Sequence, residues 1–419
     1  MSRKKLFTFF VVALCLAALT GLLYMTHERP YSEAESLSDM VLTENGYTDY
    51  FSRLAEEKGS LYAFEVLRRI KLPAGVNVHS VAHGIGYILY EEKGISGIYD
   101  CTEEFRSACA HAVVIRALSE NGPNAKSEII RACEAAPGGR GAYAICFHGV
   151  GHGFVASNDY DFRSAVVQCA EISDSVNRVS SGHRFMSARE ECIGGAVMEM
   201  VQGAHNTDAW ERAASLYLPM DDTFRPCTDE YVPESLRSAC LLSLTQRFFG
   251  AAGIAEDIPL PETYPEAMGV CATVSGKDNQ TACYGGFGKE FVFYSTQFDG
   301  GDVNRLSEGA LARIRDWCAY ADTSSGVTRC LSTALDTLFW AGENNPRSAA
   351  HFCSVLSGSD RTECYKGFIE NIRFFLVQGE RLERACGFVP PEFREACTLV
   401  ETSTSEFLFI TLGFGTMRL

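Results

Sequence analysis

The hydrophobic positions along most of the chain recur with the spacing of an α-helix, and this pattern is repeated. Segments that begin at Cys283, Cys330 and Cys364 each carry apolar residues three or four positions apart. Turn-forming runs such as Pro137–Gly139 and Ser275–Asp278 separate the helical segments. No long alternation of polar and apolar residues, which would predict a strand, occurs in the sequence. The pattern predicts an all-α fold.

The cysteines divide the helical segments into units. Of the 17 cysteines, all but Cys15 fall into successive pairs, and the second members of the pairs recur every 33 to 48 residues. A period in this range is typical of stacked helical hairpins. The predicted disulfides are Cys101–Cys109, Cys133–Cys146, Cys169–Cys192, Cys227–Cys240, Cys271–Cys283, Cys318–Cys330, Cys353–Cys364 and Cys386–Cys397.

Each predicted disulfide joins the end of one helix to the start of the next across a turn. Closing such a loop stabilises the fold by roughly 2–4 kcal/mol. Zinc ligation by thiolates is the alternative, but no C-x-x-C occurs and the pairs continue through the C-terminal half, where matching histidines are absent. The sequence therefore predicts an α-solenoid of disulfide-stapled hairpins. In this architecture alone, it resembles the secreted, disulfide-paired relatives of Sel1- and tetratricopeptide-type repeat proteins.

The N-terminus has the features of a membrane anchor. Basic residues at positions 3–5 precede an apolar run from Leu6 to Met25, which is long enough to cross a bilayer. A cleaved signal peptide is the alternative, although no A-x-A-like site follows the run. The basic flank predicts that the rest of the chain is extracytoplasmic, in the periplasm or outside the cell, where disulfides persist.

The charge composition of the chain excludes two classes of binding partner. The 419 residues carry a net charge of −16 and no basic run, which argues against binding to nucleic acid or to an anionic lipid surface. We expect the membrane contact to come from the N-terminal helix alone. The predicted organisation is an anchor over 1–25, a linker over 26–46, histidine-bearing repeats over 47–206 and further helical repeats over 207–419.

Histidines mark the N-terminal repeats. Cys146-Phe-His148-Gly-Val-Gly-His152-Gly153 places two imidazoles four residues apart, on one face of a helix. His79 and His83 repeat this spacing, and His111 follows Cys109 as His148 follows Cys146. These five of the nine histidines fall in equivalent positions of consecutive helices, and that face changes character in later repeats.

The clustering favours a metal site at His79, His83, His111, His148 and His152. Neutral imidazole suits zinc, copper or iron, and haem held by two histidines is a second possibility. Hydrogen bonding of the imidazoles to each other or to water is the alternative. His79 and His148 would lie nearly 20 Å apart in a straight stack, so either strong curvature or two sites sharing His111 is required.

Several further acids and histidines have no distinctive position in the repeat. Glu91, Glu92, Asp159, Asp161 and Glu199 are candidates to complete the ligand shell. His183, His205 and His351 fall outside the repeat frame and are expected on the surface or in loops. The glycines beside His148 and His152 would cost about 1 kcal/mol each against alanine in a helix. Close helix packing is the expected reason for them.

Two functions follow from this pattern. The first is a membrane-anchored extracytoplasmic metalloprotein with redox, hydrolytic or metal-handling activity; whether it is an enzyme is left open. The second is an interaction scaffold in which the histidines are structural and the concave face of the C-terminal repeats binds a protein partner. No P-loop, G-x-S-x-G, H-E-x-x-H or dinucleotide fingerprint is present.

Overall fold

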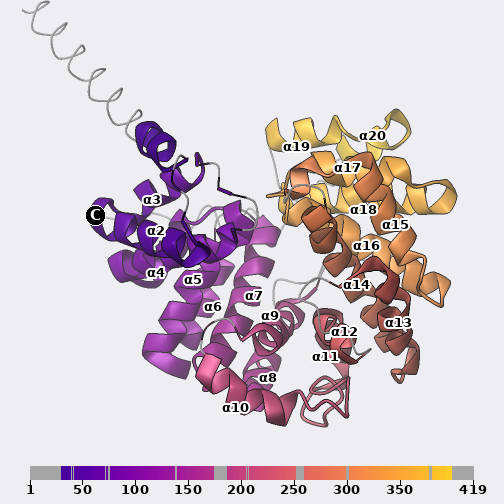
Figure 1. Ribbon diagram of the computed structural model, residues 1–419, viewed down its shortest axis with the longest axis horizontal. Coiled ribbons are helices and arrows are strands. Elements are labelled where there is room, and N and C mark those ends of the chain that lie inside the picture. Colours follow the sequence, from indigo (N-terminus) through magenta and orange to yellow (C-terminus); the bar gives the residue numbers. More distant parts are fainter. Residues whose placement is uncertain are drawn as a thin grey trace, which may run out of the picture.

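The regular structure of the chain is helical. A computed structural model describes residues 30–38, 40, 42–70, 72–73, 76–136, 139–173, 186–203, 205, 207–251, 259–298, 302–376 and 380–398. None of these residues lies in a strand (Figure 1). The all-α prediction is therefore confirmed.

The helices fall into pairs, as the cysteine spacing predicts. The second helix of each pair contains the second cysteine, and we call these helices the B row. They are α5 (Glu104–Asn121), α7 (Gly139–Ala156), α9 (Ala188–Gln202), α11 (Glu234–Ser243), α14 (Lys277–Phe298), α16 (Ser324–Trp340), α18 (Gly358–Phe375) and α20 (Pro391–Thr398).

The remaining helices are shorter on average and flank the B row. Those that carry a first cysteine are α6 (Lys126–Glu134), α8 (Phe162–Ala170), α15 (Glu308–Cys318), α17 (Pro346–Val355) and α19 (Glu380–Cys386). The others are α2 (Glu44–Lys58), α3 (Ser60–Leu67), α4 (Val78–Lys93), α10 (Thr207–Tyr217), α12 (Gln246–Ala251) and α13 (Tyr264–Gly269). Short 3₁₀ turns are η1 (Gly94–Asp100), η2 (Gly122–Ala125), η3 (Pro261–Thr263), η4 (Val270–Thr273) and η5 (Val303–Arg305).

All eight predicted disulfides are present. Each joins neighbouring cysteines 8 to 23 residues apart, with Cα atoms 5.4–5.7 Å from each other. In the pair α15/α16, for example, the bond links the last residue of one helix, Cys318, to Cys330 of the next. The disulfides indicate an oxidising, extracytoplasmic compartment for this part of the chain.

The hydrophobic core runs between the two members of each hairpin and continues from one hairpin to the next. Its largest fully buried side chains include Phe51, Phe154, Phe287 and Phe339, which come from both halves of the chain. Burial of each such ring stabilises the fold by roughly 1.5–3 kcal/mol. The two halves thus share one continuous core.

The predicted solenoid is not confirmed, because the row of helices bends back on itself. Helices α7, α9, α11, α14, α16 and α18 each pack on the next, and α18 then packs on α7. At that last contact, Phe375 lies where a side chain at Gly141 would be. The Phe105 N–H also donates to the Glu343 carboxylate at 3.0 Å. The row of helices from α7 to α18 is therefore strongly curved.

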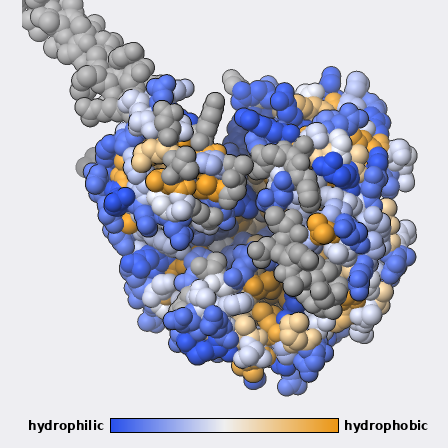
Figure 2. Space-filling model, in the orientation of Figure 1, coloured by the Kyte–Doolittle hydropathy of each residue, from blue (hydrophilic) through white to orange (hydrophobic). Residues whose placement is uncertain are grey.

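The membrane-anchor prediction lies outside the described residues, since Leu6 to Met25 are not among them. Within the part of the chain that the structure describes, no helix is both long and apolar enough to span a bilayer. The face shown in Figure 2 is largely hydrophilic, in keeping with 53 acidic and 37 basic residues.

Candidate metal centre

The histidines of α4, α5 and α7 lie together on one side of these helices. On α4, the ring centroids of His79 and His83 are 4.5 Å apart. The His111 ring on α5 lies 5.7 Å from His79 and 6.0 Å from His83. On α7, His148 and His152 are 5.1 Å apart, and both lie within 6.0 Å of His111. The five predicted residues therefore form one continuous cluster.

Glycine brings these helices close enough for the rings to meet. A β-carbon at Gly149 would lie 3.1 Å from the Cα of His111, so α7 approaches α5 almost at backbone contact. Side chains at Gly151 and Gly195 would collide with the carbonyls of Cys192 and His148, which locks α7 against α9 in the same way. Helix α7 is continuous through this stretch. Close packing is the reason for the glycines, as predicted.

A sixth histidine, His205, belongs to the cluster. It lies in the loop between α9 and α10, where a loop position was expected, but it is not a surface residue because its ring faces the other histidines. Its ring stacks on His83 at 5.7 Å and lies 6.2 Å from His152. Helix α9 ends at Gly203 in the left-handed region (φ 63°), which glycine adopts without strain. Trp210 packs on that glycine and donates its indole N–H to the Met200 carbonyl at 2.6 Å.

This turn directs His205 back toward the other rings. The spacing from the second cysteine, which placed the other five histidines, could not predict this. His205 follows the end of α9 and does not lie on a helix face. The one available signal was Gly203 itself, a helix stop placed between Glu199 and His205.

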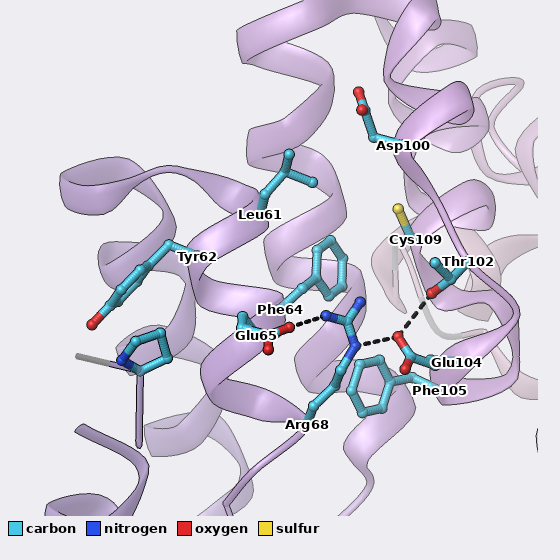
Figure 3. A pocket seen from close by; sticks show the side chains of 11 residues that line it. Leu61, Tyr62, Phe64, Glu65, Arg68, Asp100, Thr102, Glu104, Phe105 and Cys109 are labelled. Carbon is cyan, nitrogen blue, oxygen red and sulfur yellow. Dashed lines mark hydrogen bonds and ion pairs between the residues drawn. The ribbon is translucent and has the colours of Figure 1, made fainter. Parts of the chain in front are cut away.

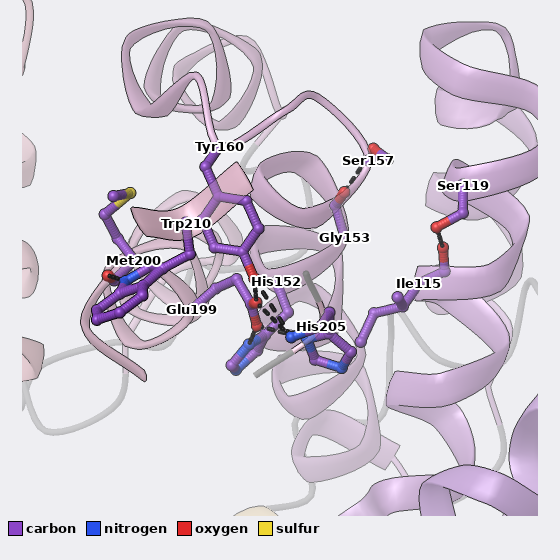
Figure 4. A network of polar contacts seen from close by, with 10 residues as sticks. All are labelled: Ile115, Ser119, His152, Gly153, Ser157, Tyr160, Glu199, Met200, His205 and Trp210. Atoms are coloured by element: carbon purple, nitrogen blue, oxygen red, sulfur yellow. Dashed lines mark hydrogen bonds and ion pairs between the residues drawn. The ribbon is translucent and has the colours of Figure 1, made fainter. Parts of the chain in front are cut away.

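Glu199 on α9 is a fully buried carboxylate that orients two of the rings. It accepts hydrogen bonds from Nδ1 of His152 at 3.0 Å and Nδ1 of His205 at 2.6 Å (Figure 4). The Tyr160 hydroxyl also donates to it. Burial alone would raise the pKa of Glu199, but the hydrogen bonds from His152 and His205 hold that pKa well below its usual range. Glu199 is therefore ionised at neutral pH.

Two further rings donate to backbone carbonyls. Nδ1 of His79 lies 2.7 Å from the Phe105 oxygen, and Nε2 of His111 lies 3.2 Å from the Ile145 oxygen. A carbonyl only accepts, so the nitrogen facing it carries the proton. In a neutral imidazole the other nitrogen then holds a lone pair. The tautomers of His79 and His111 are fixed in this way, as Glu199 fixes those of His152 and His205.

Five of the imidazoles, those of His79, His83, His111, His148 and His152, are neutral at physiological pH. Burial lowers the pKa of His79, His83 and His111 well below the usual value. The proximity of the other histidines opposes protonation further, and so does Arg106 beside His79. Burial lowers the pKa of His148 and His152 to about 4. Neutral imidazole is the form that ligates a metal ion.

Two groups of side chains have the arrangement of a metal site. In His79, His83 and His111, and separately in His152, Glu199 and His205, one nitrogen or oxygen of each residue lies within 4.8 Å of those of the other two. His148 lies beside both groups through His111 and His152. Its Nδ1 is 3.6 Å from the carboxylate of Glu191, whose pKa burial raises to about 8.

The other predicted acids and histidines lie elsewhere, with the exception of Glu199. Glu91 pairs with Arg116, and Glu92 accepts the Ser60 N–H. Asp161 caps α8, and Asp159 lies in the turn before it. His351 lies on α17 beside a separate cavity of about 540 Å³. His183 is outside the described residues.

The support behind His79 is an unusual backbone turn. Phe105, Arg106 and Ser107 at the start of α5 all have left-handed φ angles of 53–58°. Non-glycine residues in this region are strained by roughly 1–2 kcal/mol each. Next to this turn is a cavity of about 450 Å³, where Arg68 lies between Glu65 and Glu104 and the Phe64 ring faces Phe105 (Figure 3).

A search of protein-family models, of curated proteins and of solved structures finds no match to this chain, so the geometry described above is what bears on its function.

Proposed function

We propose that this protein is an extracytoplasmic metalloprotein that binds transition metal ions in the histidine cluster. The observation that carries the proposal is the direction of the ring hydrogen bonds. His79, His111, His152 and His205 each commit their one N–H to a carbonyl or to Glu199. Their remaining nitrogens can only accept.

This arrangement is unfavourable for a purely structural cluster. Four rings whose donors are committed in this way cannot hydrogen bond to one another, and a buried polar atom without a partner costs about 1–3 kcal/mol. Nε2 of His83 is such an atom, since it is buried with no hydrogen-bond partner among the described residues. A metal ion satisfies several lone pairs at once. Donation of the second ring N–H to a carboxylate or carbonyl is the usual support of metal-bound histidine.

The geometry favours two ions. His79, His83 and His111 supply one group of nitrogens, while His152 and His205 supply the other with Glu199 behind them. Nδ1 of both His152 and His205 is committed to Glu199, so Nε2 is the ligating atom and Glu199 is an orienting residue. His148 is next to both groups and completes either one.

The ligand chemistry selects the metal. Imidazole nitrogens favour zinc, copper or iron over calcium and magnesium. Haem fits less well, because the rings lie 4.5–6.2 Å from their neighbours and so occupy the space that a porphyrin plane requires. The group of His79, His83 and His111 offers three protein ligands, which leaves a coordination position open, as in catalytic metal sites. We therefore favour a catalytic centre over one that only stabilises the fold.

The proposal includes an N-terminal membrane anchor. A span from Leu6 to Met25 behind basic residues 3–5 would hold the metal centre at the outer face of a membrane. N-terminal sequencing of protein extracted from membranes tests this. A new N-terminus after the apolar run would show that the segment is a removed signal peptide.

Metal analysis of the full-length protein, purified without a polyhistidine tag, tests the metal assignment. We expect one or two equivalents of a transition metal in the wild type and loss of most of it in the double variant His148→Ala/His152→Ala. His351→Ala, in the other half of the chain, is the matched control and should retain the wild-type content. Wild-type protein that binds no zinc, copper or iron in stoichiometric amounts would contradict the proposal.

A further inference from the structure

The side of the histidine cluster that faces α14 carries two cations. Arg106 is the middle residue of the strained turn of α5, and Lys289 lies on α14. Arg106 donates to the Asn77 side-chain oxygen, which also accepts the His79 backbone N–H. Lys289 contacts Met198 on α9, one turn after Gly194, which lies against the His148 ring. Both cations therefore lie beside the cluster. In a chain with net charge −16, cations beside a proposed metal site are unexpected.

Arg106 has no carboxylate partner among the described residues. Its one polar contact there is a hydrogen bond from Nη2 to the Asn77 side-chain oxygen at 3.1 Å. Its guanidinium carbon lies 5.6 Å from the centre of the Phe293 ring on α14. A guanidinium is a fork of five donors, so most of its donors remain without a protein acceptor. A half-buried guanidinium without a charged partner destabilises the fold unless an anion binds beside it.

Lys289 lies on α14, the helix whose Phe293 ring contacts Arg106. It lies one turn before Phe293, so the two side chains project from the same side of the helix. Its side chain is 11% exposed, and its ammonium lies 3.7 Å from the Met198 sulfur on α9 and 3.2 Å from the Glu290 carboxylate. Met198 is on the helix that carries Glu199, so the ammonium reaches across to the helix that supports the metal site.

The strained turn supports a binding role for Arg106. Three consecutive non-glycine residues with φ above 50° are costly, and such strain is retained where the surrounding structure holds it in place. Here the Phe105 N–H is held by Glu343 and its carbonyl by His79. The turn therefore fixes a metal-site histidine and the Arg106 side chain together.

We propose that the metal centre takes an oxyanion, a carboxylate or a phosphate group, held between the metal ions and the two cations Arg106 and Lys289. This inference rests on the proposed function, because the anion occupies the open coordination positions of the metal. The guanidinium of Arg106 can donate to two oxygens of a carboxylate or phosphate at once. The ammonium of Lys289 acts as a compact positive charge and provides a third contact to the anion. The substrate class of the site is thus an anionic small molecule or an anionic group of a larger one.

Calorimetric titration of the metal-loaded, full-length protein tests the inference, with inorganic phosphate in one arm and succinate in the other. We expect at least one of them to bind with one anion per chain, and the arm that binds identifies the class. Loss of a charged hydrogen-bond donor should raise the Kd by about tenfold or more in Arg106→Gln and again in Lys289→Gln. Lys289→Gln leaves the strained turn intact, so it tests the site even if Arg106→Gln folds poorly.

Arg116→Gln is the control, since it removes the same charge from the same helix at an exposed ion pair with Glu91. It should bind the anion as the wild type does. Metal content measured on every sample separates the two proposals: wild type without metal contradicts the proposed function. Metal-loaded wild type that binds neither anion, or both site variants binding as tightly as wild type, overturns the anion site alone.

Discussion

The helix pairs α7/α9 and α14/α16 have the same packing but opposite chemistry. Gly151 and Gly288 both lie five residues after a second cysteine. Side chains at these glycines would collide with the carbonyls of Cys192 and Cys330, the second cysteines of the next hairpins. The close helix contact is therefore a property of the repeat and exists with or without histidine.

The faces beside these contacts differ. Two and six residues after the second cysteine, α7 has His148 and His152. At the same positions α14 has Gly285 and Lys289, and α16 has Ser332 and Asp336. Asp336 accepts a hydrogen bond from the Asn371 amide at 3.0 Å, an ordinary polar contact between helices. Glycine thus belongs to the scaffold in both halves, while the histidines are an addition to the N-terminal half.

The largest effect should come from filling the equivalent glycines. Gly151→Ala and Gly288→Ala each force two backbones apart, and we expect each to lower the free energy of unfolding by about 2–3 kcal/mol. Metal bound per folded molecule should fall only in Gly151→Ala, since only that contact positions histidines. Denaturant unfolding and metal analysis of the same samples measure both effects. A wild-type metal content in folded Gly151→Ala would break the link between close packing and the site.

Removal of the orienting carboxylate should have the next largest effect. Glu199→Gln keeps the shape but removes the charge that holds His152 and His205, and supports of this kind typically change metal affinity by about 10–100-fold. Asp336→Asn makes the same change in the other half and should leave metal affinity unaltered. Competition with a chromophoric chelator measures the affinities. Equal affinities in Glu199→Gln and wild type would show that Glu199 does not orient ligands.

The stability of the metal-free protein should depend on pH because of the buried histidines in the N-terminal half. The pKa values of His148 and His152 fall from about 6.5 when unfolded to about 4 when folded. Between these values the unfolded chain binds more protons. Stability is therefore complete above about pH 6.5 and is lost as the pH falls toward 4.

Glu191 opposes this trend, because its pKa is raised to about 8 and the folded state gains its proton first. Five histidines with lowered pKa values outweigh one such group. We expect Tm to drop by about 5 °C or more between pH 7 and pH 5. In His148→Gln/His152→Gln, Tm should change less over the same pH range. Thermal unfolding monitored by circular dichroism tests this; an unchanged Tm would indicate that the rings are solvated. Metal release should likewise occur near the lowered pKa values and not near about pH 6.5, the usual pKa of histidine.

The smallest effect is expected at His351. It lies on α17, away from the six clustered rings, and its replacement with alanine should change the free energy of unfolding by about 0.5 kcal/mol or less. Metal content should be unchanged. A loss of metal in this variant would mean that the C-terminal half contributes ligands, and the comparison between the halves would fail.

The fold was predictable from the sequence because its determinants are local. Pairs such as Cys318 and Cys330 are joined across one turn, and the helical period surrounds each pair. Five histidines could be placed by the repeat frame for the same reason. The path of the chain over longer distances was not predictable: the contact of α18 with α7 depends on small rotations summed over many hairpins.

The remaining parts of the site depend on that path. His205 enters through the left-handed turn at Gly203, and the carbonyl of Phe105 reaches His79 through the strained start of α5. Lys289 comes from a helix more than a hundred residues after His152. No periodic pattern records such contacts. A sequence identifies the helix face that carries the ligands more readily than the residues that orient them.

The central claim is that the lone pairs of the clustered imidazoles converge on metal ions. Crystals of the untagged protein, measured at wavelengths on both sides of the metal absorption edge, test it directly. We predict one or two anomalous peaks within the cluster, each about 2.0–2.2 Å from nitrogens of at least two histidine rings. Density for water alone among His79, His83, His111, His152 and His205, in protein loaded with zinc, copper or iron beforehand, would contradict the account.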